Sequence, residues 1–249
     1  LAYTSVPHHS SGYATRTHNL LLALKGIGRN VECVTRYSYP WVDLGLEADS
    51  EGDLDIIDEI PYHRQQADEN YLKLTLEKRL QAAVDSLVEH CEKEGVPEIL
   101  HAASNWMNGI VAAHAGRIIG IPVVYEIRGL WELTREAKDP DFKGSEHSQM
   151  ISRMEVEAAR AADCVIAITE GLRQELISRG VPADRIRLAQ NGVDTERFQP
   201  LEKNMVLAEE LDIPEGPVVG YVGSLVHYEG LHLLLEAVAK LRREDRWKG

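Results

Sequence analysis

The sequence predicts an α/β fold, a doubly wound parallel sheet of the Rossmann type. Short apolar runs alternate with longer amphipathic runs along most of the 249 residues, as in chains of strand–helix–strand units. The runs at 123–127 and 165–168 are apolar nearly throughout, which is typical of parallel strands covered on both faces. No segment repeats with the period of a solenoid.

Seven runs have the length and composition of strands. In chain order they are residues 1–6, 31–36, 56–64, 98–103, 121–127, 163–169 and 185–190. Proline has no amide hydrogen for a ladder, so Pro61 is expected to end the third run or place it at a sheet edge.

Helices are expected between these strands. They cover residues 13–25, 68–95, 106–119, 144–162 and 170–180. The long run at 68–95 has leucine and other apolar residues at three- and four-residue steps and stops at Gly95. Ser145 is expected to cap the fourth helix and Gly180 to close the fifth.

The chain changes character near residue 200. A polar helical stretch at 201–216 leads to a buried strand at 217–224 and an amphipathic helix at 229–244. One strand and one helix cannot enclose a core. We therefore expect 1–200 to form one Rossmann-like domain and 201–249 to hold a linker and the incomplete start of a second. The chain opens at Leu1, without Met, inside a strand-like run, which fits a processed or excised piece.

Composition excludes several classes of protein. The formal net charge of -13 argues against a nucleic-acid binder, which needs a basic face. The three cysteines are scattered and form no C-x-x-C pair, so reduced core thiols in a cytoplasmic protein are expected. No apolar run approaches the ~18 residues of a membrane span.

Ligands of an open parallel sheet bind beyond the carboxyl ends of its strands. The first such loop carries Gly12, whose backbone can approach a ligand, and Arg16, which favours an anion together with the helix N-terminus. The alternative is a plain turn capped by Ser11. His101 lies near the end of the run 98–103, and Ser104, Asn105 and Trp106 open the helix that follows. These residues suit sugar or base contacts or, equally, a helix cap and a core tryptophan.

The loop after 121–127 holds the most specific signal. Glu126 ends an apolar strand and needs a partner if it is buried, and Arg128 or Arg135 could supply one. The interpretation is either a strand-end ion pair or ligand recognition with charge stabilisation, with Trp131 beside it. No protein nucleophile motif and no metal-binding motif occurs, so no metal is expected.

Six segments in this order resemble the family-four retaining glycosyltransferases of the GT-B fold, in particular the bacterial polysaccharide-type members. They are "GYATRTHNLLLAL", "ILHAASNWMNG", "IPVVYEIRGLWE", "ADCVIAITEGLRQEL", "QNGVDTERFQP" and "GYVGSLVHYEGLHLLLEA". The resemblance implies two facing Rossmann-like domains and transfer of a sugar from a nucleotide diphosphate to a glycan or lipid-linked acceptor. The departing phosphate would assist the acceptor, which agrees with the lack of a protein nucleophile.

The resemblance also implies site residues. The catalytic candidates are Glu126 and Arg128, the latter at a position where many members have histidine. The candidates for contacts with substrate and phosphate are Gly12, Thr15, Arg16, His101, Asn105, Trp131, Asn191, Gly223 and Ser224. Many members carry arginine after the glycine that matches Gly223 and lysine near the later one, where Ser224 and Glu229 stand here.

One family element is missing from the sequence, the E-x7-E element deep in the second domain that holds the donor sugar. We therefore expect this polypeptide alone to turn over poorly. The alternatives are a nicotinamide-dependent oxidoreductase, which would want a G-x-G-x-x-G turn, and a one-domain binding module for sugar or nucleotide. Peripheral membrane contact stays open, because the basic residues of the first helix are few.

Overall fold

A computed structural model of the chain describes residues 1–46, 52–67, 70–213, 215–216, 218–223 and 225–244. These residues divide into two compact units. The first comprises Leu1–Leu133 and Asp141–Asn191, and the second Thr134–Pro140 and Gly192–Gly249. The predicted boundary at residue 200 stays a prediction.

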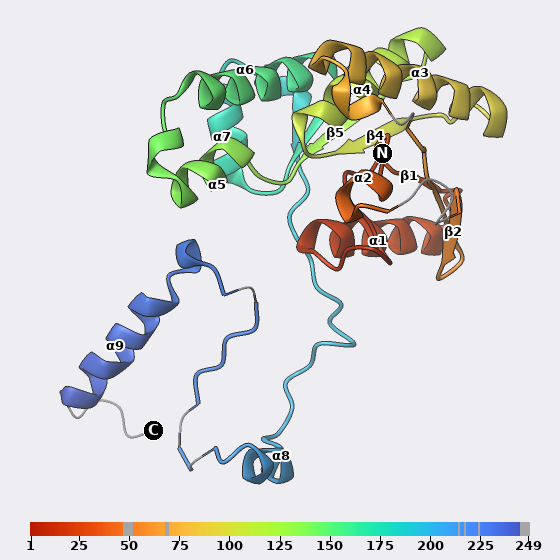
Figure 1. Cartoon of the computed structure of the whole chain (residues 1–249). Coiled ribbons are helices and arrows are strands. Elements are labelled where there is room, and N and C mark those ends of the chain that lie inside the picture. Colours follow the sequence, from red (N-terminus) through yellow and green to blue (C-terminus); the bar gives the residue numbers. More distant parts are fainter. Residues whose placement is uncertain (47–51, 68–69, 214, 217, 224, 245–249) are drawn as a thin grey trace. The chain divides into compact units, whose positions relative to one another are not determined.

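The first unit contains the expected parallel sheet in two sections (Figure 1). Strands β4, β5, β6 and β7 are parallel and adjacent in that order, and β1, β3 and β2 form a three-stranded section. The strands are β1 Cys33–Val34, β2 Leu54–Ile57, β3 Ile60–His63, β4 Leu100–Ala103, β5 Val123–Ile127, β6 Cys164–Ala167 and β7 Ile186–Leu188.

The first two residues of the chain join these sections. Ala2 N donates to Val34 O at 2.9 Å, and Ala103 N donates to Leu1 O at 3.0 Å. The strand predicted at 1–6 is therefore reduced to a single parallel bridge between Ala2 and Thr35, followed by bends and turns. The result is the doubly wound α/β order that the sequence predicts.

The prediction for Pro61 was wrong. Pro61 lies inside β3, the middle strand of its section, and faces Ile56 of β2 across an antiparallel hairpin. A two-residue turn at Asp58 and Glu59 makes the next cross-strand pair, Ile56 with Pro61, a pair without hydrogen bonds. On the other side, β1 begins to pair only at Tyr62, so no ladder bond is lost.

The helices agree with the sequence in position and differ in length. They are α1 Gly12–Gly26, α2 Trp41–Leu44, α3 Leu76–Glu94, α4 Trp106–Ile119, α5 Trp131–Lys138, α6 Glu146–Ala161, α7 Glu170–Ser178, α8 Met205–Glu210 and α9 Leu231–Arg243. The helix predicted from residue 68 begins at Leu76, because the Thr75 hydroxyl accepts from Lys78 N. Residues 68 and 69 lie outside the described residues. Ser145 caps α6 as predicted. The short helices α2 and α5 are absent from the helices that the sequence predicts.

Helices α3, α4 and α6 pack in a row on one face of the sheet (Figure 1). Val34 of β1 and Leu87 of α3 belong to the large buried cluster on this face. The opposite face of β1 and β3 presents Cys33 and Tyr62 to Leu21 and its neighbours in α1. No helix among the described residues combines the length and apolar character needed to cross a bilayer.

Gly116 marks the closest approach of α4 to β5. A Cβ at this position would overlap Val123 Cγ2 and lie 2.9 Å from Ile121 O. Gly116→Ala is therefore expected to lower the free energy of unfolding by about 1–3 kcal/mol, because a packed core tolerates no added methyl group. Urea denaturation measures it, with Gly26→Ala, whose Cβ meets nothing within 4 Å, as the control. Equal stability of the two variants would contradict the close packing.

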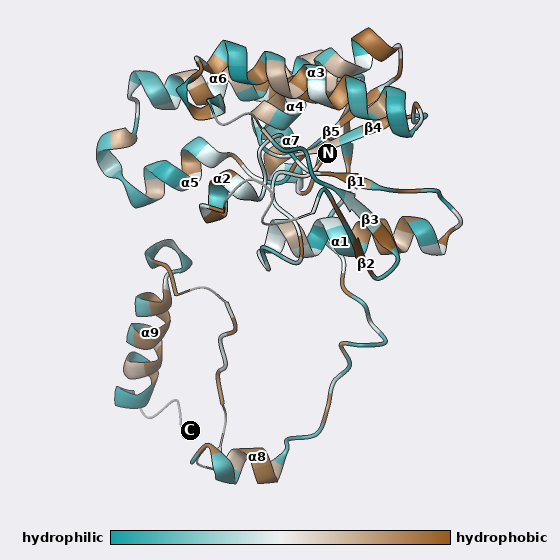
Figure 2. Ribbon diagram, turned by 45° about the vertical axis from the view of Figure 1, so that its right-hand side comes forward, coloured by the Kyte–Doolittle hydropathy of each residue, from teal (hydrophilic) through white to brown (hydrophobic). Residues whose placement is uncertain are grey.

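The second unit contains α8 and α9. The strand predicted at 217–224 was wrong for the residues that are described, since 218–223 form no strand and their side chains are exposed. A strand needs a neighbouring strand for its hydrogen bonds, and the described residues of this unit offer none. Helix α9 is amphipathic, as Figure 2 shows by its mixed colouring.

Candidate functional site

Glu126, near the carboxyl end of β5, lies between two arginines. Its Oε1 accepts hydrogen bonds from Arg16 Nε at 2.9 Å and Nη2 at 2.6 Å. Its Oε2 accepts from Arg128 Nε at 3.0 Å and Nη2 at 2.6 Å. Arg128 is thus confirmed as one partner of this carboxylate. Arg16, 110 residues earlier in the chain, is the other.

This arrangement keeps the carboxylate ionised. Burial alone would raise the pKa of Glu126, because a charged group is costly away from water. The interaction with His101 and the charge and hydrogen bonds of Arg128 outweigh burial and hold this pKa well below its usual range. A compact, permanently ionised cluster therefore lies at the strand ends.

Helix α1 delivers Arg16 to this cluster. The Ser11 hydroxyl caps the helix by accepting from Ala14 N at 3.3 Å. Arg128 then binds the next turn, since its Nη1 donates to Tyr13 O at 2.9 Å and to Thr17 Oγ1 at 2.7 Å. The first two turns of α1 are fixed against the end of β5 in this way.

Side-chain exposure separates the cluster into two groups. Glu126 is 1% exposed and Arg128 4% exposed, so neither presents a surface to a ligand. Arg16 is 20% exposed and His101 of β4 is 33% exposed, with its Nε2 3.3 Å from Glu126 Oε2. Arg16 and His101 are thus the more exposed members of the cluster, and Glu126 and Arg128 are its buried members.

Arg16 also reaches the residues that follow β7. Its Nη1 donates to Asn191 Oδ1 at 2.7 Å, and its Nη2 donates to Ala189 O at 3.0 Å. Among the described residues, four hydrogen bonds occupy four of the five N–H donors of this guanidinium. The carboxyl end of β5, the residues after β7 and the start of α1 thus meet at one guanidinium.

The remaining predicted residues have other surroundings. Asn105 caps α4, since its Oδ1 accepts from Met107 N at 3.2 Å. Gly12 and Thr15 are exposed on the first turn of α1. Trp131 packs edge-to-face against Tyr3, with ring centroids 4.9 Å apart. Gly223 belongs to the second unit, and Ser224 lies outside the described residues.

Sequence reasoning missed two residues of the cluster, Tyr13 and Thr17, which bind Arg128. Ser104, which the sequence placed at this strand exit, accepts from Arg128 N through its Oγ at 2.8 Å. The four-residue spacing of Tyr13 and Thr17 places both on one side of a helix, which is the signal that the sequence carried. Nothing in the sequence indicated that this side faces β5.

Comparison with known proteins identifies a family and several relatives of this chain. Residues 11–192 match the family described as the glycosyl transferase 4-like domain. The chain is 33% identical to alpha-maltose-1-phosphate synthase of Mycolicibacterium smegmatis over 53% of its length. It is 30% identical to D-inositol 3-phosphate glycosyltransferase of Corynebacterium jeikeium over 70% of its length.

A solved structure supports the fold. The chain resembles the Anabaena protein HepE, determined in complex with UDP and glucose, with a TM-score of 0.56 and 21% identity over 73% of this chain. The matched stretches cover 35% of the synthase, 42% of the inositol phosphate transferase and 45% of HepE. The chain therefore spans less than half the length of these relatives.

Proposed function

The chain belongs to the glycosyl transferase 4-like family, and from this we propose that residues 1–200 form the acceptor-side domain of a retaining glycosyltransferase. The observation that carries the proposal is the ionised cluster of Arg16, Glu126 and Arg128 at the carboxyl ends of the strands. Ligands of open α/β sheets bind at this edge. The cluster lies in a stretch that matches the family throughout.

The proposed donor is a nucleotide diphosphate sugar. Two observations support it: HepE was solved with UDP and glucose, and one relative is named a GDP-mannose-dependent alpha-mannosyltransferase. The proposed acceptor is a glycan or a lipid-linked sugar of polysaccharide synthesis. Residues 201–249 would begin the donor-side domain, with Gly223 and Ser224 near the donor phosphates.

Each exposed residue has a proposed role. His101 contacts the reacting sugar, and the free donor of Arg16 contacts a phosphate oxygen, aided by the α1 N-terminus at Gly12 and Thr15. Trp131 offers an aromatic edge for a sugar ring. Glu126 and Arg128 hold Arg16 and His101 in place without touching substrate.

A donor screen tests the proposal. The chain joined to a complete second Rossmann-like domain is incubated with UDP-, GDP- and ADP-sugars and an acceptor panel. NMR of the product then reads the anomeric configuration. Transfer with retention supports the proposal. Binding of NAD in place of any nucleotide sugar, or efficient transfer by the 249 residues alone, would overturn it.

His101→Ala is expected to lower kcat/KM of the transfer by about a hundredfold, the scale for loss of one preorganised polar contact. Its imidazole is one-third exposed, so the variant should still fold, which circular dichroism checks. His114→Ala, an exposed histidine of α4, is the matched control and should leave transfer unchanged. Equal rates for the two variants would remove His101 from the site.

A further inference from the structure

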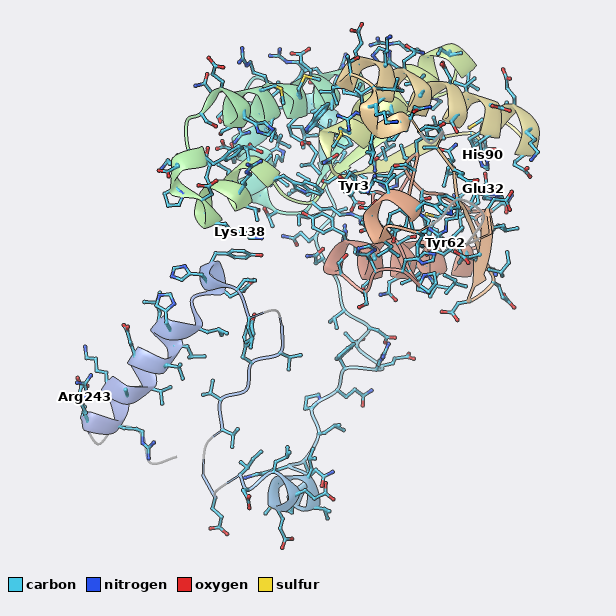
Figure 3. All side chains as sticks on the ribbon, in the orientation of Figure 1. Tyr3, Glu32, Tyr62, His90, Lys138 and Arg243 are labelled. Carbon is cyan, nitrogen blue, oxygen red and sulfur yellow. The ribbon has the colours of Figure 1, made fainter. Side chains whose placement is uncertain are left out.

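Glu32, His63 and His90 bring three metal-ligating atoms together outside the site described above. One ligand atom from each side chain lies within 4.8 Å of the other two. His63 Nε2 is 3.3 Å from Glu32 Oε2, and His90 Nε2 is 3.7 Å from Glu32 Oε1. Figure 3 labels Glu32 and His90 at this place. The sequence predicted no metal, because these residues are far apart along the chain.

The fold positions the three side chains independently. In the parallel pair of β1 and β3, Val34 is aligned with His63, and Glu32 lies two residues before Val34. Alternation along a strand places Glu32, Val34 and His63 on one face of the sheet. Helix α3 covers this face through the buried cluster that holds Val34 and Leu87, and His90 belongs to its last two turns.

One nitrogen of the three-residue group has no hydrogen-bond partner in the described part of the chain. His90 Nε2 is buried and has no hydrogen-bond partner among the described residues. A buried polar atom without a partner is costly and calls for an occupant. The two imidazole rings lie 4.6 Å apart between centroids, and the Glu32 carboxylate lies beside both of them.

We propose that Glu32, His63 and His90 bind one divalent transition-metal ion, with zinc as the expected ion. Two imidazole nitrogens and a carboxylate are a donor set that zinc prefers. Zinc bonds of ~2.1 Å in a tetrahedral arrangement separate neighbouring donor atoms by about 3.4 Å. The separations of 3.3 Å from His63 Nε2 to Glu32 Oε2 and 3.7 Å from His90 Nε2 to Glu32 Oε1 lie close to this value. The single ligand atoms of the three residues lie within 4.8 Å of one another, so small side-chain movements would bring all three to an ion.

The group is open to solvent on the side of Glu32. Glu32 is 40% exposed, whereas His63 and His90 are 18% and 12% exposed. Water or an external ligand can therefore complete the coordination. The ion would link the β1–β3 section of the sheet to α3, and its binding would stabilise the first unit.

Zinc titration of the metal-free 249-residue chain, followed by calorimetry and by thermal unfolding, tests the proposal. We expect one zinc ion to bind and to raise the Tm. Glu32→Gln and His90→Ala should each weaken binding by more than about a hundredfold, because loss of an outer-shell partner alone costs 10–100-fold. Circular dichroism checks folding, and Glu32→Gln, at the exposed side of the group, decides the result if His90→Ala does not fold.

His18→Ala is the matched control. His18 Nε2 also pairs with a carboxylate, Asp58, at 2.9 Å, and the described residues provide no third ligand there. The His18→Ala variant should bind zinc with the same affinity as the unaltered chain. Cobalt supplies a second readout: visible d–d bands without a thiolate-to-cobalt charge-transfer band indicate nitrogen and oxygen ligands. Absence of zinc binding, unchanged affinity in both Glu32→Gln and His90→Ala, or a thiolate band would overturn the proposal.

Discussion

Glu126→Ala is expected to destabilise the first unit by about 3–5 kcal/mol, the cost of removing one partner from a buried ion pair. The carboxylate is 1% exposed and accepts two hydrogen bonds from each of two guanidinium groups. Its loss leaves Arg128, 4% exposed, with an uncompensated buried charge. Urea denaturation followed by circular dichroism measures the loss.

The exposed pair of Glu170 and Arg173 on α7 provides the control. Glu170→Gln removes a carboxylate from a pair with the same 3.0 Å distance in solvent, and no measurable change is expected. A double variant sharpens the test, because removing Arg128 together with Glu126 also removes the stranded charge. Its loss should be smaller than the sum of the two single losses. Strict additivity, or a stable Glu126→Ala variant, would show that the cluster is not a coupled unit.

The fold was predictable where local signals agreed with one another. Helix α4 spans the predicted residues because Asn105 caps its start and Gly120, with φ of +84°, ends it. The hairpin of β2 and β3 was not predictable in this way. Asp58 and Glu59 both adopt positive φ at its turn, and neither residue is the glycine that usually marks such a turn.

The candidate site was predictable only where its residues are close together in the sequence. Glu126 near the end of β5 and Arg128 just after it are two residues apart, so the sequence offered Arg128 as one of two candidate partners, with Arg135 as the other. The bonds from Arg16 to Glu126 and Asn191 join residues 110 and 175 positions apart. They depend on how α1 packs against the sheet, which no local pattern determines. The proposed metal ligands Glu32, His63 and His90 are likewise brought together only by the packing of elements that are distant in the sequence.

Glu155→Gln is expected to stabilise the protein at pH 8 and to leave its stability at pH 4.5 nearly unchanged. Glu155 of α6 is fully buried, and burial raises its pKa to about 7 from an ordinary value of 4.5. The hydrogen bond from the Tyr125 hydroxyl opposes this shift, and the neighbouring charge of Glu132 adds to it. Its Oε2 has no hydrogen-bond partner among the described residues.

The direction of the pH dependence follows from these values. Between about pH 4.5 and 7 the unfolded chain has released the proton of Glu155 while the folded chain still holds it. The unfolded state then binds fewer protons, so the free energy of unfolding falls as the pH rises. A shift of this size corresponds to about 3 kcal/mol above pH 7, and glutamine, which carries no charge, should recover it.

Urea denaturation of the unaltered protein and of Glu155→Gln between pH 4.5 and pH 8 measures the free energy of unfolding that the glutamine recovers. Glu157→Gln, an exposed position of the same helix, is the control and should leave the slope against pH unaltered. An unchanged slope in Glu155→Gln would mean that this carboxyl ionises without penalty. Tyr125, whose hydroxyl donates to Glu155, directly precedes Glu126 on β5. The buried carboxyl of Glu155 is thus linked through one side chain to the strand that holds the ionised cluster.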